Sequence, residues 1–307
     1  MKDNFEVVFE RELFPQGTAA SMDALDEVER LEKMLSVFRF DSKIQYINST
    51  AHEEPVAVEP ELFDLMTLCL DFAELTGGAV DITSGPLWKI WGFAKREGRV
   101  PSDVEIADTL KNVDYRSVQL DSGEHTVTFT KSGIELNFGC VGKGFAVDAG
   151  AKKLREQGVD RFRFQGGLSS ILAEGADWTF GIAHPLRPGQ RLTELTLNNA
   201  AVATSGSDKQ FFRHKGHRYS HIIDPRTGRP AEGVLSATVI APTGTLAELL
   251  STAFFVLGPD WAEKYCAEHS DVSALFVLPA RKGNLCDVRR IGIDCDRPEQ
   301  HEELNFC

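Results

Sequence analysis

The order of short strand-like runs and longer helical runs constrains the fold of this chain more than any other feature. Apolar residues three or four positions apart predict helices over residues 21–38, 60–75, 245–257 and 261–269, and residues 139–158 are expected to form a glycine-rich loop followed by a helix that Gly158 ends. Runs rich in β-branched and aromatic residues predict strands over residues 117–120, 126–130, 134–138, 161–164, 179–182, 194–197, 200–204, 219–223, 236–241 and 273–278. Residues 38–50 fit neither pattern and are expected to form an irregular bend. Strands and helices do not alternate regularly, so the order predicts an α+β protein and not a series of βαβ units.

The charge balance limits the partners of the protein. Its 307 residues contain 33 Lys and Arg against 46 Asp and Glu, a net charge of -13. This charge argues against a nucleic-acid groove or an anionic membrane surface as the main partner. No apolar run approaches the roughly 18 residues of a membrane span, and the start MKDNFEVVFE lacks the features of a secretory signal. We expect a cytoplasmic protein as the sequence stands, or a periplasmic one if a leader is missing from it.

The six cysteines show neither a CxxC pair nor the spacing of a zinc site. A chain of this length can bury a large core, so a disulfide framework is not expected. Cys69 and Cys266 fall in helical patterns and are expected to be buried thiols.

Residues 139–144, GCVGKG, form a glycine-rich loop between a predicted strand and a predicted helix. Glycines let backbone N–H groups approach an anion, the helix N-terminus favours negative charge, and Lys143 adds a positive charge. The loop is not a P-loop, because Asn137 and Gly144 stand where that motif needs glycine and a hydroxyl residue. The residues alone fit a phosphate site and an ordinary turn with a solvated lysine equally well.

The helix predicted over residues 245–257 carries three polar residues on one face. Glu248, Ser251 and Thr252 lie three and four positions apart among apolar residues. A carboxylate and hydroxyls in this arrangement could bind a hard cation such as Mg²⁺ through oxygen. The alternative, which the local sequence favours, is a capping box in which Thr245 and Glu248 satisfy backbone groups at the helix start. Thr252 would then bond back to a carbonyl one turn earlier.

Two further segments combine polar and aromatic residues. In residues 77–93, Asp81 precedes two tryptophans, which could wall a pocket for a planar ring with Asp81 bonded to the ligand, or form a buried aromatic loop. In residues 219–230, YSHIIDPRTGRP, a strand containing His221 is expected to end at the Asp-Pro pair. Taken alone, this segment is most simply a strand followed by a turn in which Asp224 bonds its own backbone.

Six segments follow one another in an order that resembles the ApbE family. They are GGAVDITSGPLWKIWGF, LNFGCVGKGFAVDAGAKKL, FQGGLSSILAEG, AVATSGSDKQFF, YSHIIDPRTGRP and AELLSTAFFVLG. The runs GKGFAVD, VATSG and SHIIDPRTG are the most specific, and the resemblance covers about residues 36–258. It implies an α+β, ApbE-like fold with mixed or antiparallel sheets, packed helices and a flavin site between two subdomains.

The resemblance also implies an activity, because ApbE proteins are FAD:protein FMN transferases. Such enzymes bind FAD as a substrate and use Mg²⁺ to cleave its pyrophosphate. They attach FMN to a Thr or Ser hydroxyl of an acceptor protein that carries a flavinylation motif, and they release AMP. Phosphoryl chemistry of this kind needs the charge of the pyrophosphate to be neutralised and the hydroxyl to be activated by a base.

Matching positions imply roles for individual residues. His221 resembles the histidine that assists the acceptor hydroxyl. The implied FAD contacts are Ala79, Val80, Asp81, Asn137, Lys143 and Ile223. The implied metal ligands are the side chains of Glu248 and Thr252 and backbone oxygens of Cys140 and Ser251.

Three positions depart from the usual family pattern. Glu248 and Asn137 each replace an aspartate, and Leu168 replaces the aspartate of GGD. The N-terminal region also has no good match to the usual MGT-like start. Two alternatives to transfer therefore stay open: a non-catalytic FAD-binding protein, and a Mg²⁺-dependent FAD pyrophosphatase that gives FMN and AMP. The domain is expected to span residues 1–282, and residues 283–307 are a polar tail without an assignment.

Overall fold

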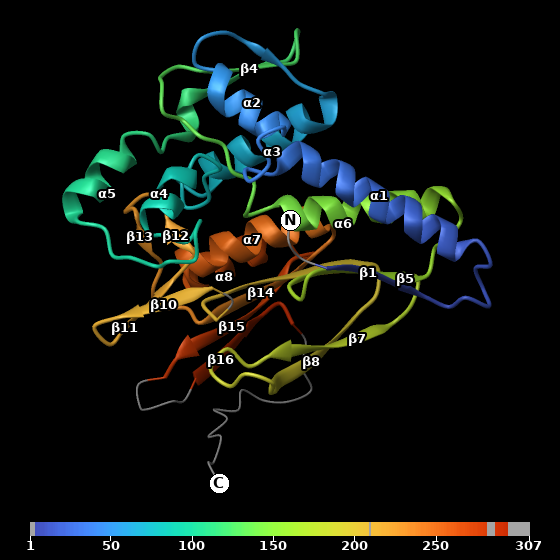
Figure 1. Cartoon of the computed structure of the whole chain (residues 1–307). Helices are drawn as coiled ribbons and strands as arrows, with labels where there is room; N and C mark the ends of the chain where they lie inside the picture. The colour runs from blue at the N-terminus through green and yellow to red at the C-terminus, as the bar shows by residue number, and fades with distance from the viewer. Residues whose placement is uncertain (1–3, 209, 281–285, 294–307) are drawn as a thin grey trace. The chain divides into compact units, whose positions relative to one another are not determined.

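The computed structural model describes residues 4–208, 210–280 and 286–293. The chain forms two compact units, and each is built from segments that are distant in sequence (Figure 1). The first unit comprises residues 1–30, 141–209 and 232–307, and the second comprises residues 31–140 and 210–231. Helix α1 (Gly17–Leu35) begins in the first unit and ends in the second.

The first unit is built on a seven-stranded sheet in the order β1-β5-β6-β9-β14-β15-β16, and every neighbouring pair is antiparallel. Its strands are β1 (Phe5–Phe9), β5 (Phe162–Gly166), β6 (Ser170–Glu174), β9 (Ala200–Gly206), β14 (Ser236–Ala241), β15 (Ser273–Pro279) and β16 (Cys286–Ile291). The other elements are helices α6 (Gly142–Glu156), α7 (Gly244–Leu257) and α8 (Pro259–Glu268), and the hairpin of β7 (Trp178–Ala183) and β8 (Arg191–Leu197). Figure 1 shows α6 and α7 above this sheet and the β7–β8 hairpin below it.

Helices α6 and α7 approach each other closely at their first turns. A Cβ atom on Gly144 of α6 would lie 2.1 Å from the carbonyl oxygen of Gly244, so only glycine permits this contact. Helix α7 is apolar on most of its surface, and its buried apolar residues are Ala247, Leu249, Leu250, Ala253, Phe254 and Phe255. The helix is therefore part of the core, and the polar residues it carries are held in a largely buried setting.

The second unit is mainly helical. Its helices are α2 (Lys43–Thr50), α3 (Pro60–Leu75), α4 (Gly85–Ile90), α5 (Asp103–Leu110) and the 3-10 turn η1 (Tyr115–Ser117). Its strands are β2 (Val56–Ala57), β3 (Val118–Asp121) and β4 (Thr126–Phe129) in one sheet, and the hairpins of β10 (Phe211–His214) with β11 (His217–Ser220) and of β12 (Ile223–Asp224) with β13 (Arg229–Pro230). A core cluster of Trp91, Phe93 and Ile106 packs against Phe212 and Tyr219, so the late segment 210–231 is anchored to the early one.

The predicted α+β class is confirmed, and several elements agree closely with their predicted bounds. Helix α3 and strand β14 have the predicted bounds of 60–75 and 236–241. Helix α7 ends at Leu257, before Gly258 at φ 83°. Cys69 and Cys266 are buried thiols, as expected.

Three local predictions are wrong. Residues 38–50 contain helix α2, because the Ser42 side chain accepts a hydrogen bond from the backbone N–H of Gln45 and starts a helix. Residues 134–138 do not form a strand, although alternate side chains are buried; the backbone N–H and carbonyl of Leu136 bond instead to the Asn48 side chain. Residues 219–223 are not one strand, since β11 ends at Ser220 and β12 begins at Ile223.

The polar tail contains an element that its composition did not indicate. Strand β16 pairs with β15 over residues 286–291, so part of the tail is the edge strand of the large sheet. The pattern is hard to detect because an edge strand has one exposed side and carries charged residues there. Residues 283–285 and 294–307 of the tail lie outside the described residues.

Candidate active site

Glu248 of the first unit has a buried carboxylate. It is only 5% exposed on helix α7. Its Oε1 accepts a 2.5 Å hydrogen bond from Ser170 Oγ and lies 2.8 Å from Nζ of Lys143. Its Oε2 is buried and has no hydrogen-bond partner among the described residues. A buried carboxylate oxygen without a partner is costly, so this oxygen indicates a place for a further positive group.

The alternative of a capping box at Thr245 and Glu248 is wrong. The N-cap of α7 is Thr243, whose side chain accepts a hydrogen bond from the backbone N–H of Leu246. Thr245 instead donates its hydroxyl to Asp148 at 2.5 Å. Glu248 is thus not used to satisfy the helix start, and its carboxylate is available for another role.

Helix α7 is capped from a neighbouring helix. Asp148 of α6 accepts hydrogen bonds from the backbone N–H groups of Gly244 and Thr245 at 2.7 and 2.8 Å, in addition to the Thr245 hydroxyl. Burial raises the pKa of the Asp148 carboxyl above its ordinary value, and the three donors oppose this shift. These bonds hold the start of α7 against α6, and so determine the distance between Glu248 and Lys143.

Ser251 and Thr252 lie on the same side of α7 as a serine of strand β9. Ser205 Oγ is 2.9 Å from Ser251 Oγ and 3.4 Å from Thr252 Oγ1. Ser251 also donates to the backbone carbonyl of Glu248 at 3.0 Å. Within the first unit, Lys143 thus contacts Glu248 on α7, the helix that also carries Ser251 and Thr252.

The predicted FAD contacts at 79–81 have side chains turned into the protein. Ala79 and Val80 are 1% and 2% exposed. Asp81 accepts hydrogen bonds from the backbone N–H and hydroxyl of Thr83, both at 2.7 Å, and from the backbone N–H of Tyr115 at 3.1 Å. Burial raises the pKa of Asp81. Its carboxylate organises the loop, and a ligand at this segment would meet mainly backbone atoms.

Asn137 lies beside the 79–81 segment. Its backbone N–H donates to the carbonyl of Ile82 at 2.7 Å, and its side-chain oxygen accepts from the N–H of Gly139 at 2.9 Å. The amide thus shapes the glycine loop at the point where it leaves the second unit. Cys140, the last residue of the first segment of that unit, is half-buried.

His221 sits in the gap between β11 and β12. Its Nδ1 lies 3.0 Å from the carbonyl oxygen of Gln210, and its backbone N–H donates to the same oxygen at 3.1 Å. A carbonyl oxygen only accepts, so Nδ1 carries a proton, and in the neutral form of the ring Nε2 is the acceptor nitrogen. The break in the strand therefore places a histidine whose tautomer suits a general base.

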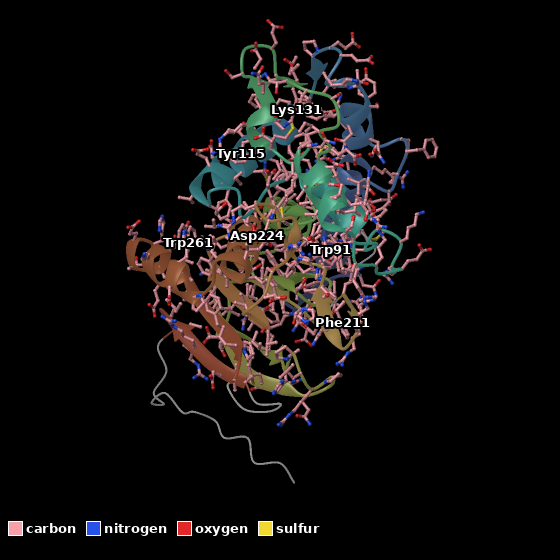
Figure 2. The ribbon with its side chains drawn as sticks, turned by 90° about the vertical axis from the view of Figure 1, so that its left-hand side faces the viewer. Trp91, Tyr115, Lys131, Phe211, Asp224 and Trp261 are labelled. Atoms are coloured by element: carbon pink, nitrogen blue, oxygen red, sulfur yellow. The ribbon has the colours of Figure 1, made fainter. Side chains whose placement is uncertain are left out.

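The rest of the segment 219–230 behaves as an ordinary turn. Asp224, which is labelled in Figure 2, accepts the backbone N–H of Arg226 at 3.0 Å, which confirms the Asx-type turn. It also binds the Arg226 guanidinium through both oxygens at 2.8 Å. Ile223, a predicted flavin contact, packs against the core cluster of Trp91 and Phe93. Trp91 is 1% exposed and donates to the Gly228 carbonyl, so it is a core residue of a buried aromatic loop.

Sequence reasoning missed Ser170, Asp148 and Ser205. Each is a small polar residue inside a motif that was noticed for other reasons, and each acts on a residue distant in sequence. Ser170 and Glu248, for example, are 78 positions apart. Only the fold shows that they meet.

A family model matches most of the chain. The model described as the ApbE family covers residues 1–276. The chain belongs to the ApbE family. The expected ApbE-like α+β fold is confirmed by the crystal structure of the ApbE protein from Thermotoga maritima, which has a TM-score of 0.82 and 31% identity and covers 93% of this chain and 92% of its own.

Two curated ApbE relatives carry the name FAD:protein FMN transferase. The protein of Treponema pallidum (strain Nichols) is 34% identical over 285 residues, which is 84% of this chain and 78% of its own length. The protein of Haemophilus influenzae is 30% identical over 283 residues, which is 87% of this chain and 81% of its own length. Among the residues that the structure describes, no helix is long and apolar enough to cross a membrane.

Proposed function

We propose that this ApbE protein is a Mg²⁺-dependent FAD:protein FMN transferase, which moves FMN from FAD to a Thr or Ser hydroxyl of an acceptor protein and releases AMP. The observation that carries the proposal is the Glu248 carboxylate, buried beside Lys143 with one oxygen bonded and the other without a hydrogen-bond partner among the described residues. The names of its relatives support the same activity.

The donor set on α7 fits a hard cation. A carboxylate oxygen of Glu248 and the hydroxyl of Thr252 are ligands of the type that Mg²⁺ prefers, and Mg²⁺ usually takes few protein ligands besides substrate phosphates. The proposed site agrees with this preference for few protein ligands, since within the described part of the chain no group of three or more His, Cys, Asp or Glu residues could hold a metal ion. A bound Mg²⁺ would supply positive charge to the pyrophosphate. Backbone oxygens of Cys140 and Ser251 stay predicted ligands.

Lys143 and the start of α6 supply the remaining positive field. The N-cap residue Val141 gives no side-chain hydrogen bond to the first turn of α6, so the backbone N–H groups there suit phosphate oxygens. Lys143, the second residue of the helix, adds a full charge at the same end. Together they favour an anion at the glycine loop, and we assign the FAD pyrophosphate to it.

His221 is the proposed general base. The acceptor hydroxyl oxygen attacks the phosphorus on the FMN side of the pyrophosphate and forms a new P–O bond. The bridging P–O bond breaks, AMP leaves with its electron pair, and the hydroxyl proton moves to Nε2 of His221. The Gln210 carbonyl accepts the hydrogen of Nδ1, so that before the reaction Nε2 carries no proton and can accept one.

The test is to incubate the purified protein with FAD and MgCl₂, with and without an acceptor domain that carries a flavinylation motif, and to measure AMP by chromatography. We expect AMP release that needs both Mg²⁺ and acceptor, with one flavin attached for each AMP. Equal AMP release without acceptor, together with free FMN, would instead indicate a pyrophosphatase, because water can replace the hydroxyl. Intact bound FAD under all conditions would indicate a flavin-binding protein.

The pyrophosphatase is a second candidate, because water can replace the acceptor hydroxyl in the same site and FAD would then be cleaved without a protein acceptor. The acceptor dependence of AMP release separates the pyrophosphatase from the transferase. Glu248 bears on the non-catalytic alternative: glutamate places its carboxylate one methylene farther from the backbone than the usual aspartate, which changes the reach of the ligand but not its charge.

A further inference from the structure

Residues 210–223 form a basic stretch in an acidic protein. They contain Arg213, Lys215 and Arg218 together with three histidines and no Asp or Glu, whereas the whole chain has a net charge of -13. All of these residues belong to the second unit. Most of the stretch is the β10–β11 hairpin, which Figure 1 shows as a separate two-stranded ribbon.

The hairpin places two arginines directly opposite each other. Arg213 of β10 pairs in register with Arg218 of β11, and His214 pairs with His217. Like charges in opposite positions of an antiparallel pair destabilise it. The turn adds a second cost, because Lys215 adopts a left-handed backbone with φ 49°. By the pairing rules alone, neither the opposed Arg213 and Arg218 nor the backbone of Lys215 favours formation of this hairpin.

The other face of the hairpin is firmly anchored. Phe212 stacks on Tyr219 with ring centroids 5.2 Å apart, and Tyr219 lies 5.4 Å from the ring of Trp91. This packing turns the neighbouring positions away from the core, since side chains alternate along a strand. Phe211 is 42% exposed, and the Arg218 guanidinium lies 3.9 Å from its ring centroid (Figure 2). Arg213 is exposed beside them. The result is a surface that contains one exposed aromatic ring, the exposed Arg213 and the partly buried Arg218.

The hairpin is continuous with the proposed base. Strand β11 ends at Ser220, the next residue is His221, and the residue before β10 is Gln210, whose carbonyl binds the His221 ring. A protein chain that brings a hydroxyl to His221 must therefore lie close to the end of this hairpin. The location favours the acceptor over a nucleic acid or a membrane, which the net charge of -13 also disfavours.

We propose that the β10–β11 hairpin is the docking surface for an acidic segment of the acceptor protein, with Arg213, Arg218 and Phe211 as its main contacts. This inference rests on the proposed transferase function. An acidic partner is repelled by the protein as a whole, and a local positive surface next to His221 in the chain overcomes that repulsion and orients the partner. Such attraction between exposed charges weakens as salt is added.

The test uses an acceptor domain on which the wild-type protein attaches FMN. Arg213→Glu replaces the Arg–Arg pair by an opposite-charge pair, so the melting temperature should stay the same or rise. The KM for the acceptor should nevertheless increase about fivefold, the effect of an exposed charge contact, while the KM for FAD stays unchanged. Lys264→Glu, an exposed lysine of the first unit, changes the net charge equally and should leave both values unchanged.

Charge exchange completes the test. The acceptor in which Asp and Glu residues beside the target hydroxyl are changed to Lys should be labelled poorly by wild type and better by Arg213→Glu/Arg218→Glu. An unchanged KM for the acceptor in Arg213→Glu would overturn the proposal, and so would an increased KM for FAD, which would assign the arginines to the nucleotide. If wild type labels no acceptor at all, the transferase function itself fails, and the docking proposal with it.

Discussion

Glu248→Gln removes one negative charge from the centre of the candidate metal site. Hydrogen bonds to a charged group contribute roughly 1.5 to 3 kcal/mol, and breaking a fully buried ion pair costs about 3 to 5 kcal/mol. Glu248 is 5% exposed, but the side chain of Lys143 is 21% exposed and can turn toward water. We therefore expect the variant to lose about 2 kcal/mol of unfolding free energy, a value within the first of these two ranges.

Thermal unfolding with and without MgCl₂ is the assay. A loss of about 2 kcal/mol lowers the melting temperature of a unit this size by roughly 4 to 8 °C. A ligand at 100 times its dissociation constant stabilises the protein that binds it by about 2.7 kcal/mol, so Mg²⁺ should raise the melting temperature of wild type. Glu248→Gln should show little response to Mg²⁺, and Glu248→Asp, which keeps the charge, should keep part of it.

Two results would refute this reasoning. A variant that is destabilised but responds to Mg²⁺ as wild type does would show that Glu248 is not a metal ligand. A variant with unchanged stability would show that the bonds to Ser170 and Lys143 contribute nothing to the fold, and that the carboxylate is not held as described.

Three further predictions concern neighbouring residues. Asp148→Asn leaves one donor of the α7 cap unpaired and should lower the free energy of unfolding by about 1 to 3 kcal/mol, measured by chemical denaturation. Burial raises the folded-state pKa of Asp148 above 3.8, so the stabilisation linked to this shift is fully present below pH 3.8 and is lost as the pH rises through the folded-state pKa. The difference in unfolding free energy between wild type and Asp148→Asn should therefore become smaller over that pH range. Ser170→Ala should weaken Mg²⁺ binding in calorimetry, and Ser170→Thr, which keeps the hydroxyl, should restore part of it; equal affinity in all three proteins would exclude a positioning role for Ser170. His221→Ala should lower the rate of transfer by about 10² to 10⁴-fold without changing FAD affinity in a fluorescence titration, and a variant that transfers FMN at the wild-type rate would exclude His221 as the base.

Much of the fold could be predicted because local signals agreed with tertiary structure. Helix α3 begins at Pro60, a favourable first residue, and α7 ends at Leu257, before a glycine with positive φ. The failures occurred where one side chain decided the backbone path. Ser42 starts α2, and Asn48 takes the hydrogen bonds of Leu136 that a strand would have used. The spacing of apolar residues in the sequence does not indicate such a side-chain contact.

The residues of the candidate site could be listed from the sequence, but their hydrogen-bond partners and the tautomer of His221 could not be predicted. The spacing of Glu248, Ser251 and Thr252 suited both a cation site and a cap, and the local sequence favoured the cap; the choice depended on whether Thr243 or Thr245 caps the helix. His221 was expected inside a strand, whereas the break after Ser220 lets the Gln210 carbonyl select its tautomer. In both cases a hydrogen bond decides the outcome, and the pattern of apolar residues carries no information about hydrogen bonds.

The most direct test of the central claim is the intact mass of an acceptor domain after incubation with the protein, FAD and Mg²⁺. The account predicts that the acceptor gains the mass of one FMN at a single Thr or Ser, that one AMP appears for each modified acceptor, and that Glu248→Gln gives neither. An acceptor of unchanged mass, with FAD either intact or cleaved to free FMN, would contradict the assignment of this protein as a flavin transferase.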